Sequence, residues 1–90
     1  MFQLSIVTPS GNVFEDSVES IAVNGLMGGF EVYSNHMPML CALKDGKVKI
    51  RRDGKVIKSL TIDSGVLEVN ATHNVLLLAD QILSDSLPPS

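Results

Sequence analysis

Residues 47–62 read KVKIRRDGKVIKSLTI, two strand-like segments on either side of Asp53-Gly54. In the first segment apolar and basic side chains alternate, so Val48 and Ile50 are expected to face inward and the basic side chains to face solvent. Asp-Gly is a preferred pair for the two-residue turn of a β-hairpin. This stretch therefore predicts an antiparallel hairpin with one buried face and one solvated face.

Short strand-like segments separated by turn signals recur along the whole chain. The turn signals stand at residues 8–12, 45–46, 63–65 and 70–74. No window of 12 or more residues keeps a helical period with caps at both ends. Many short strands between regular turns are typical of a sandwich or barrel. We expect an all-β fold, an antiparallel β-sandwich of short strands, in residues 1–80, with residues 81–90 as a short C-terminal tail.

The composition is that of one globular domain. The chain has 90 residues, 44% of them hydrophobic and 19% charged. The single cysteine, Cys41, cannot form an internal disulfide, which fits a reducing compartment. The N-terminus lacks the basic lead and long apolar run of a signal peptide, and no apolar run is long enough to cross a bilayer. We therefore expect a soluble protein.

Charge is distributed unevenly along the chain. The net charge of −3 argues against general nucleic-acid binding, so no nucleic-acid partner is expected. All seven basic residues lie in residues 44–58 with two acids, a net of +5, while the rest of the chain carries −8. Two interpretations of the basic segment stay open. Lysines on strand edges and solvent faces keep small sandwiches from pairing with one another, or the stripe meets an acidic partner.

Residue patterns for catalysis or for binding a metal or cofactor are missing. His36 and His73 stand 37 residues apart, with no cysteine or acid at ligand spacing. Cys41 lies in an apolar run, which favours an inert core thiol over a nucleophile. The glycines of residues 25–29 lack the ending of a phosphate-binding loop. We expect no catalytic, cofactor or metal site.

Residues 25–39, GLMGGFEVYSNHMPM, are unusually apolar for a turn-rich stretch. Phe30 and Val32 fit a strand, whereas Leu26 and Met27 lie between glycines and are less suited to a core. Methionine and aromatic side chains in such a segment suit an adaptable binding surface. We expect this segment to be partly core and partly contact surface.

The same segment carries a family resemblance. The spacing Gly25-x-x-Gly28-x-Phe30-x-Val32, followed by His36-x-Pro38-x-Leu40-x-x-Leu43 and Gly46, resembles the epsilon subunit of F-type ATP synthases. The flanks agree in order: Val7-Thr8-Pro9, Val13-Phe14, Ser64-Gly65, Leu67-Glu68-Val69-Asn70, Asn74-Val75 and Leu78-Ala79-Asp80.

The resemblance implies a non-catalytic central-stalk (rotor) subunit without a cofactor. Such a subunit links gamma to the c-ring of a proton-transporting ATP synthase and couples proton transport to ATP synthesis. It is peripheral to the cytoplasmic face of a bacterial inner membrane through the complex and is not inserted. By position, the resemblance assigns Thr8, His36, Pro38 and Leu40 to the gamma interface and Gly28, Gly29, Phe30 and Glu31 to the c-ring interface.

The sequence also departs from the family pattern. Gly29 stands where the family often has an acid, and Glu31 is the alternative acid two residues on. Ser34-Asn35 replaces the usual Pro-Gly. Residues 81–90 are too short for the two C-terminal helices of many members, so the inhibition and ATP site that those helices provide are expected to be missing. The chain is either a short natural form, which Met1 favours, or a truncated one.

Another class of function stays open. Biotinyl and lipoyl carriers are also small all-β domains, with a modifiable lysine at a hairpin tip. Lys44 precedes Asp45-Gly46 but lacks the usual flanking residues. A β-sandwich binding module of some other kind is the remaining alternative, and an intact mass without an attached cofactor would dismiss the carrier.

Overall fold

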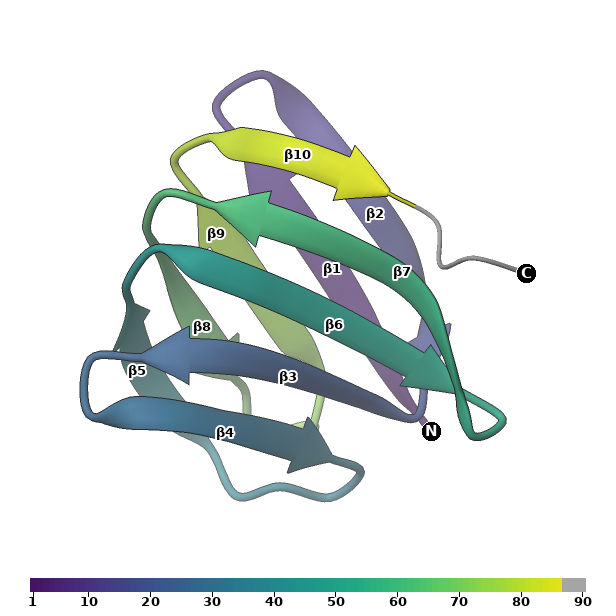
Figure 1. Ribbon diagram of the computed structural model, residues 1–90. Coiled ribbons are helices and arrows are strands. Elements are labelled where there is room, and N and C mark those ends of the chain that lie inside the picture. Colours follow the sequence, from purple (N-terminus) through teal and green to yellow (C-terminus); the bar gives the residue numbers. More distant parts are fainter. Residues whose placement is uncertain (87–90) are drawn as a thin grey trace.

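The computed structural model describes residues 1–86, and in them it contains ten β-strands and no helix (Figure 1). No helix with the length and hydropathy of a membrane span occurs in these residues. The expectation of an all-β fold is confirmed. The strands are β1 (Phe2–Thr8), β2 (Gly11–Val18), β3 (Ser20–Gly25), β4 (Gly28–Tyr33), β5 (Met39–Leu43), β6 (Gly46–Arg52), β7 (Lys55–Ile62), β8 (Gly65–Val69), β9 (Val75–Ala79) and β10 (Ile82–Ser86).

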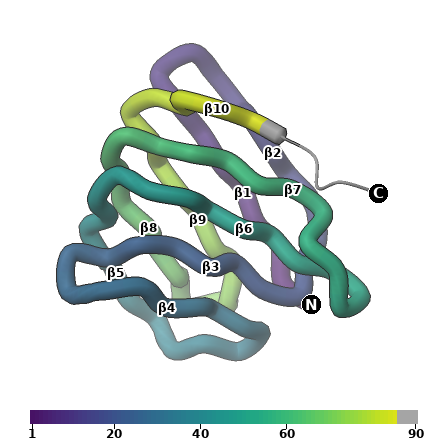
Figure 2. The backbone as a smooth tube through the Cα atoms, viewed as in Figure 1, coloured from purple at the N-terminus to yellow at the C-terminus, as the bar shows by residue number. Residues whose placement is uncertain are grey.

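One long sheet curls into two layers. Its strand order is β10-β7-β6-β3-β5-β8-β9-β1-β2, and β4 pairs with β3 outside this path. β3 joins the layers, because its first half pairs with β6 while Gly25 at its end pairs with Leu43 of β5. β10, β7, β6, β3 and β4 form the front layer in Figures 1 and 2, and β2, β1, β9, β8 and β5 form the back layer.

The hairpin of β6 and β7 forms as its sequence predicts. Val48 and Ile50 are buried, and the lysines on either side of Val48 face solvent. Asp53 and Gly54 both have positive φ, 54° and 75°, at the turn. That geometry is required by the tight hairpin turn for which Asp-Gly is favoured.

The core lies between the layers and receives side chains from both. Its fully buried large side chains are Leu4, Ile6, Ile21, Ile50, Leu60, Ile62, Leu67, Leu77, Val18, Val32, Val48 and Val69. Burial of each contributes about 1.5–3 kcal/mol relative to exposure in water. Val32 therefore belongs to the core half of the segment 25–39.

One strand pair is parallel. β1 and β9 pair from Leu4 opposite Val75 to Val7 opposite Leu78. The other pairings in residues 1–86 are antiparallel, as expected for the sandwich. The parallel pair joins the first strand of the chain to β9 in the back layer.

The sheet continues past the expected boundary at residue 80. β10 lies in the segment expected as a tail and pairs with β7. Lys58 Nζ lies 3.1 Å from Asp85 Oδ1 and links the two strands. Residues 87–90 lie outside the described residues.

The turns gather at two ends of the sandwich. Gly25 pairs with Leu43, and Leu43 pairs with Gly65. Gly65 pairs in turn with Ala79, which lies beside the end of β1. The β1–β2, β3–β4 and β5–β6 turns therefore lie at one end, here called the β3–β4 end. The β4–β5 loop and the β8–β9 turn lie at the opposite end (Figure 1).

Candidate docking surface

The outer face of the back layer carries a row of apolar side chains across four strands. Ala42 of β5 is opposite Val66 of β8, which is opposite Leu78 of β9, which is opposite Val7 of β1. Their sequence neighbours Leu67 and Leu77 face the core, so these four side chains face outward. We call Val7, Ala42, Val66 and Leu78 the apolar row.

A second row beside it is mixed. Leu40 is opposite Glu68, and Glu68 is opposite Leu76. Leu40 is 73% exposed and Leu78 of the apolar row is 46% exposed. Exposed apolar side chains that adjoin one another on a sheet face make that face a candidate for contact with another macromolecule.

Sequence reasoning missed the apolar row. Its signal is the run VLLLA in residues 75–79, which is apolar without alternation. A strand with one solvated face alternates, whereas an unbroken apolar strand is typical of burial on both faces. β9 has the pattern of a strand covered on both sides.

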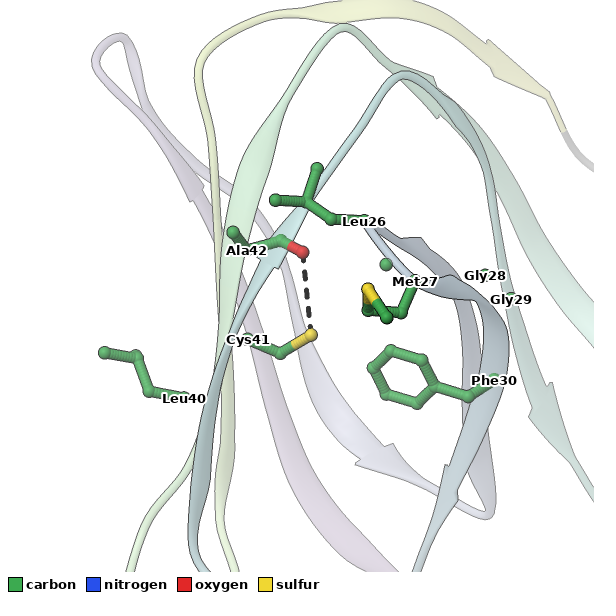
Figure 3. A pocket seen from close by; sticks show the side chains of 9 residues that line it. Leu26, Met27, Gly28, Gly29, Phe30, Leu40, Cys41 and Ala42 are labelled. Carbon is green, nitrogen blue, oxygen red and sulfur yellow. Dashed lines mark hydrogen bonds between the residues drawn. The ribbon is translucent and has the colours of Figure 1, made fainter.

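An apolar hollow lies between the β3–β4 turn and β5. Its lining residues, all within residues 1–86, carry no charged side chain: Gly25, Leu26, Met27, Gly28, Gly29, Phe30, Leu40, Cys41 and Ala42. Figure 3 shows Phe30 and Cys41 pointing into the hollow from β4 and β5, and Leu40 pointing away from it. Its volume is about 430 Å³. Cys41 is half-buried here and is not part of the fully buried core.

Glycines shape the turn beside the hollow. A Cβ on Gly25 would lie 2.9 Å from Cε1 of Phe30, so a larger residue would displace the ring. Gly28 has φ 127°, a conformation open mainly to glycine. Leu26 and Met27 lie at the tip between them, largely and fully exposed. The Leu26 N–H donates a 3.3 Å hydrogen bond to the Ala42 carbonyl, which ties the tip to β5.

Glu31 belongs to a polar network on the front layer, away from the hollow. Its carboxylate accepts hydrogen bonds from Ser20 Oγ (2.7 Å) and Tyr33 OH (2.8 Å). Arg51 Nε lies 3.5 Å from it. The hydrogen bond from Ser20 lowers the pKa of Glu31, and the hydrogen bond from Tyr33 and the positive charge of Arg51 act in the same direction. The hydrogen bond to Glu31 raises the pKa of Tyr33.

The structure thus divides the residues that the resemblance assigns to the c-ring. Gly28, Gly29 and Phe30 line the hollow, whereas Glu31 lies among polar partners on the front layer. Glu31 is held by contacts within the chain, with Ser20, Tyr33 and Arg51.

The residues assigned to gamma lie at opposite ends of the molecule. Thr8 is at the β3–β4 end beside Leu78, where its hydroxyl donates to the Gly11 carbonyl at 3.3 Å. His36 and Pro38 lie in the β4–β5 loop at the other end. There His73 Nδ1 lies 3.0 Å from the His36 carbonyl oxygen. Thr8 and Leu40 adjoin the apolar row, whereas His36 and Pro38 lie beyond the start of β5.

The front layer presents basic chemistry on its outer face. Lys47 and Lys49 lie along β6 and are exposed. Arg51 is paired with Glu31, and Arg52 is paired with Asp16 at 2.9 Å. The two outer faces of the sandwich therefore differ: one carries the apolar row and the other carries Lys47 and Lys49. In the described part of the chain no group of three histidine, cysteine or acidic side chains could hold a metal ion.

The fold and the apolar row define a class, a small β-sandwich with one outer face suited to contact within an assembly. A family model described as the ATP synthase delta/epsilon chain β-sandwich domain matches residues 1–85. The chain belongs to this family.

Curated relatives support the same assignment. The chain is 39% identical over 79 residues to the ATP synthase epsilon chain of Chlorobium limicola, covering 88% of this chain and 90% of that one. It is 35% identical to the epsilon chain of Aquifex aeolicus, covering 100% of this chain and 67% of that one. The Chlorobium limicola protein is thus similar in length to this chain.

Solved structures share the fold. A chain from the central stalk/c-ring of the Tetrahymena thermophila mitochondrial ATP synthase matches with a TM-score of 0.80 at 16% identity, covering 92% of this chain and 66% of that one. A chain from the Euglena gracilis mitochondrial ATP synthase matches with a TM-score of 0.83 at 19% identity, covering 91% of this chain and 52% of that one. At these identities the likeness concerns the fold.

Proposed function

We propose that this chain is a non-catalytic rotor subunit that links gamma to the c-ring and couples proton transport to ATP synthesis. The observation that carries the proposal is the apolar row on the outer face of the back layer. Membership of the delta/epsilon family supports it. The subunit is peripheral to the cytoplasmic face of a bacterial inner membrane, held there by the complex.

The apolar row is the centre of the proposed gamma interface. Burial of apolar surface contributes about 25 cal/mol per Å², and a sheet face needs no rearrangement to be covered. Thr8 and Leu40 adjoin this row. His36 and Pro38 extend the contact only if gamma also reaches the far end of β5.

The β3–β4 end is the proposed c-ring end. Gly28 and Gly29 lie beside its tip, and the exposed side chains there are Leu26 and Met27. With Glu31 held by Ser20, Tyr33 and Arg51, the c-ring contact of this chain rests on backbone and apolar groups at the tip.

A binding experiment tests the gamma interface. The purified chain is mixed with the gamma subunit from the same source, and the complex is measured by size-exclusion chromatography and calorimetry. A one-to-one complex is expected, and Leu78→Asp should weaken it more than about tenfold, because a carboxylate would be buried unpaired at the centre of the contact.

Leu83→Asp is the matched control. Leu83 is 56% exposed and lies on β10 in the front layer, so the same change there should leave gamma affinity unaltered. Failure to form a complex at micromolar concentration would contradict the proposed function. Equal affinity of Leu78→Asp and the unchanged chain would remove the apolar row from the interface.

A further inference from the structure

We infer that the hollow between the β3–β4 turn and β5 is an anchor pocket for one large apolar side chain of the gamma subunit. The inference rests on the proposed function, because it names the partner that covers the apolar row. It assigns to gamma contact a site lined in part by Gly28, Gly29 and Phe30, which the sequence resemblance places at the c-ring.

The chemistry of the hollow selects an apolar occupant. Phe30, Cys41 and Met27 supply its side-chain surface, and none of them carries a charge. The carbonyl of Ala42 already accepts from the Leu26 N–H at 3.3 Å and lies 3.5 Å from the Cys41 thiol. A polar group entering the hollow would lose its water and find little to bond with, which costs about 1–3 kcal/mol.

The hollow is large enough for a large apolar side chain of a partner. About 430 Å³ open to the surface can take a leucine, methionine or phenylalanine side chain with room for adjustment. The ring of Phe30 offers a face or an edge to an aromatic guest.

The position of the hollow identifies the partner. β5 separates the hollow from the apolar row, and Ala42 belongs to both. Within residues 1–86, Leu43 is the one residue of β5 that pairs with β3, so the rest of this edge of β5 borders the hollow. A subunit that covers the row therefore lies next to the hollow, with β5 between them. Buried apolar anchors beside a larger contact area are the usual sites of high binding energy.

The one cysteine of the chain reports on the hollow directly. Its thiol points into the hollow, so N-ethylmaleimide should alkylate Cys41 in the free chain (Figure 3). Mass spectrometry of this chain measures the rate of the alkylation. Saturating gamma should slow it by more than about tenfold. Conversely, the chain alkylated beforehand at Cys41 should bind gamma about tenfold more weakly, because the adduct fills the hollow.

Cys41→Ser is the control for the second measurement, because N-ethylmaleimide should leave its gamma affinity unchanged. A normal complex in which Cys41 reacts at the rate of the free chain would overturn the inference and leave the proposed function intact. Protection that appears only when the c-ring is added would assign the hollow to the c-ring and overturn the inference. Absence of any complex with gamma would overturn both.

Discussion

Ser20 Oγ donates a 2.7 Å hydrogen bond to Glu31 Oε2 across the β3–β4 pair. Ser20 is fully buried, although it points toward the outer face of the front layer, because Glu31 and its partners cover it. The pair ties Glu31 to the neighbouring strand within the chain. It also makes part of the stability of the fold depend on pH.

The first prediction concerns that pH dependence. Because the folded-state pKa of Glu31 is lowered, its contribution to stability is present above the unfolded pKa of about 4.3 and is lost as the pH falls through the folded value. Ser20→Ala removes the largest cause of the lowered Glu31 pKa and should cost about 1 kcal/mol at neutral pH. The free energy of unfolding of Ser20→Ala should also fall less steeply than that of the unchanged chain as the pH is lowered.

Urea unfolding at a series of pH values measures this effect. Asp16, whose pKa is also lowered, by its hydrogen bond from Arg52, contributes in the same direction in both proteins, so the comparison isolates Glu31. Parallel stability curves for Ser20→Ala and the unchanged chain would show that the hydrogen bond has no such role.

The second prediction separates folding from docking at two adjacent residues. Leu77 is fully buried, so Leu77→Ala should lower the free energy of unfolding by about 2–5 kcal/mol. Leu78 faces outward from the same strand, so Leu78→Ala should change it by less than about 0.5 kcal/mol. Chemical denaturation measures both. A large loss of stability in Leu78→Ala would mean that this leucine serves the fold of the free chain.

The alternation and turns of the fold could be predicted from sequence because they are local. Val48 and Ile50 face inward and Asp53-Gly54 turns the hairpin, since both properties depend on adjacent residues. The parallel pair of β1 and β9 could not, because its register joins opposite ends of the chain. β10 was missed because Ile82–Ser86 is short and mostly polar, and its pairing with β7 decides its conformation.

The candidate site was predicted in part for the same reason. Exposure of Leu26 and Met27 follows from their place between glycines. The apolar row depends on which strands are neighbours, so Val66 and Leu78 had no local pattern to join them. The partners of Glu31 also had no local pattern, because only the sheet register brings Ser20 and Arg51 beside it.

The third prediction tests the glycine that shapes the hollow. Gly25→Ala places a Cβ 2.9 Å from the Phe30 ring and 3.2 Å from the Gly28 carbonyl, so the ring must move. We expect a loss of about 1–3 kcal/mol in the free energy of unfolding, as in other overpacked sites.

Gly29→Ala is its control. Its Cβ would meet the Asn24 side chain at 3.3 Å, which can give way more readily than an aromatic ring packed on the core. Thermal unfolding should therefore show a smaller loss for Gly29→Ala. An equal loss for both would remove the special role of Gly25.

The fourth prediction concerns the basic face. Lys49 lies on the outer face of the front layer, opposite Ala22 of β3, whereas the apolar row lies on the outer face of the back layer. Lys49→Glu should therefore change gamma affinity by less than about twofold. Stopped-flow association at low and high salt checks it, because exposed charges are screened over about 8–10 Å at physiological ionic strength.

If the variant associates tenfold more slowly at low salt and normally at high salt, the basic stripe steers gamma and the acidic-partner interpretation holds. If Lys49→Glu and the unchanged chain associate with gamma at the same rates, the lysines are accounted for by the other interpretation, in which they keep the sheet from pairing with other copies of the chain.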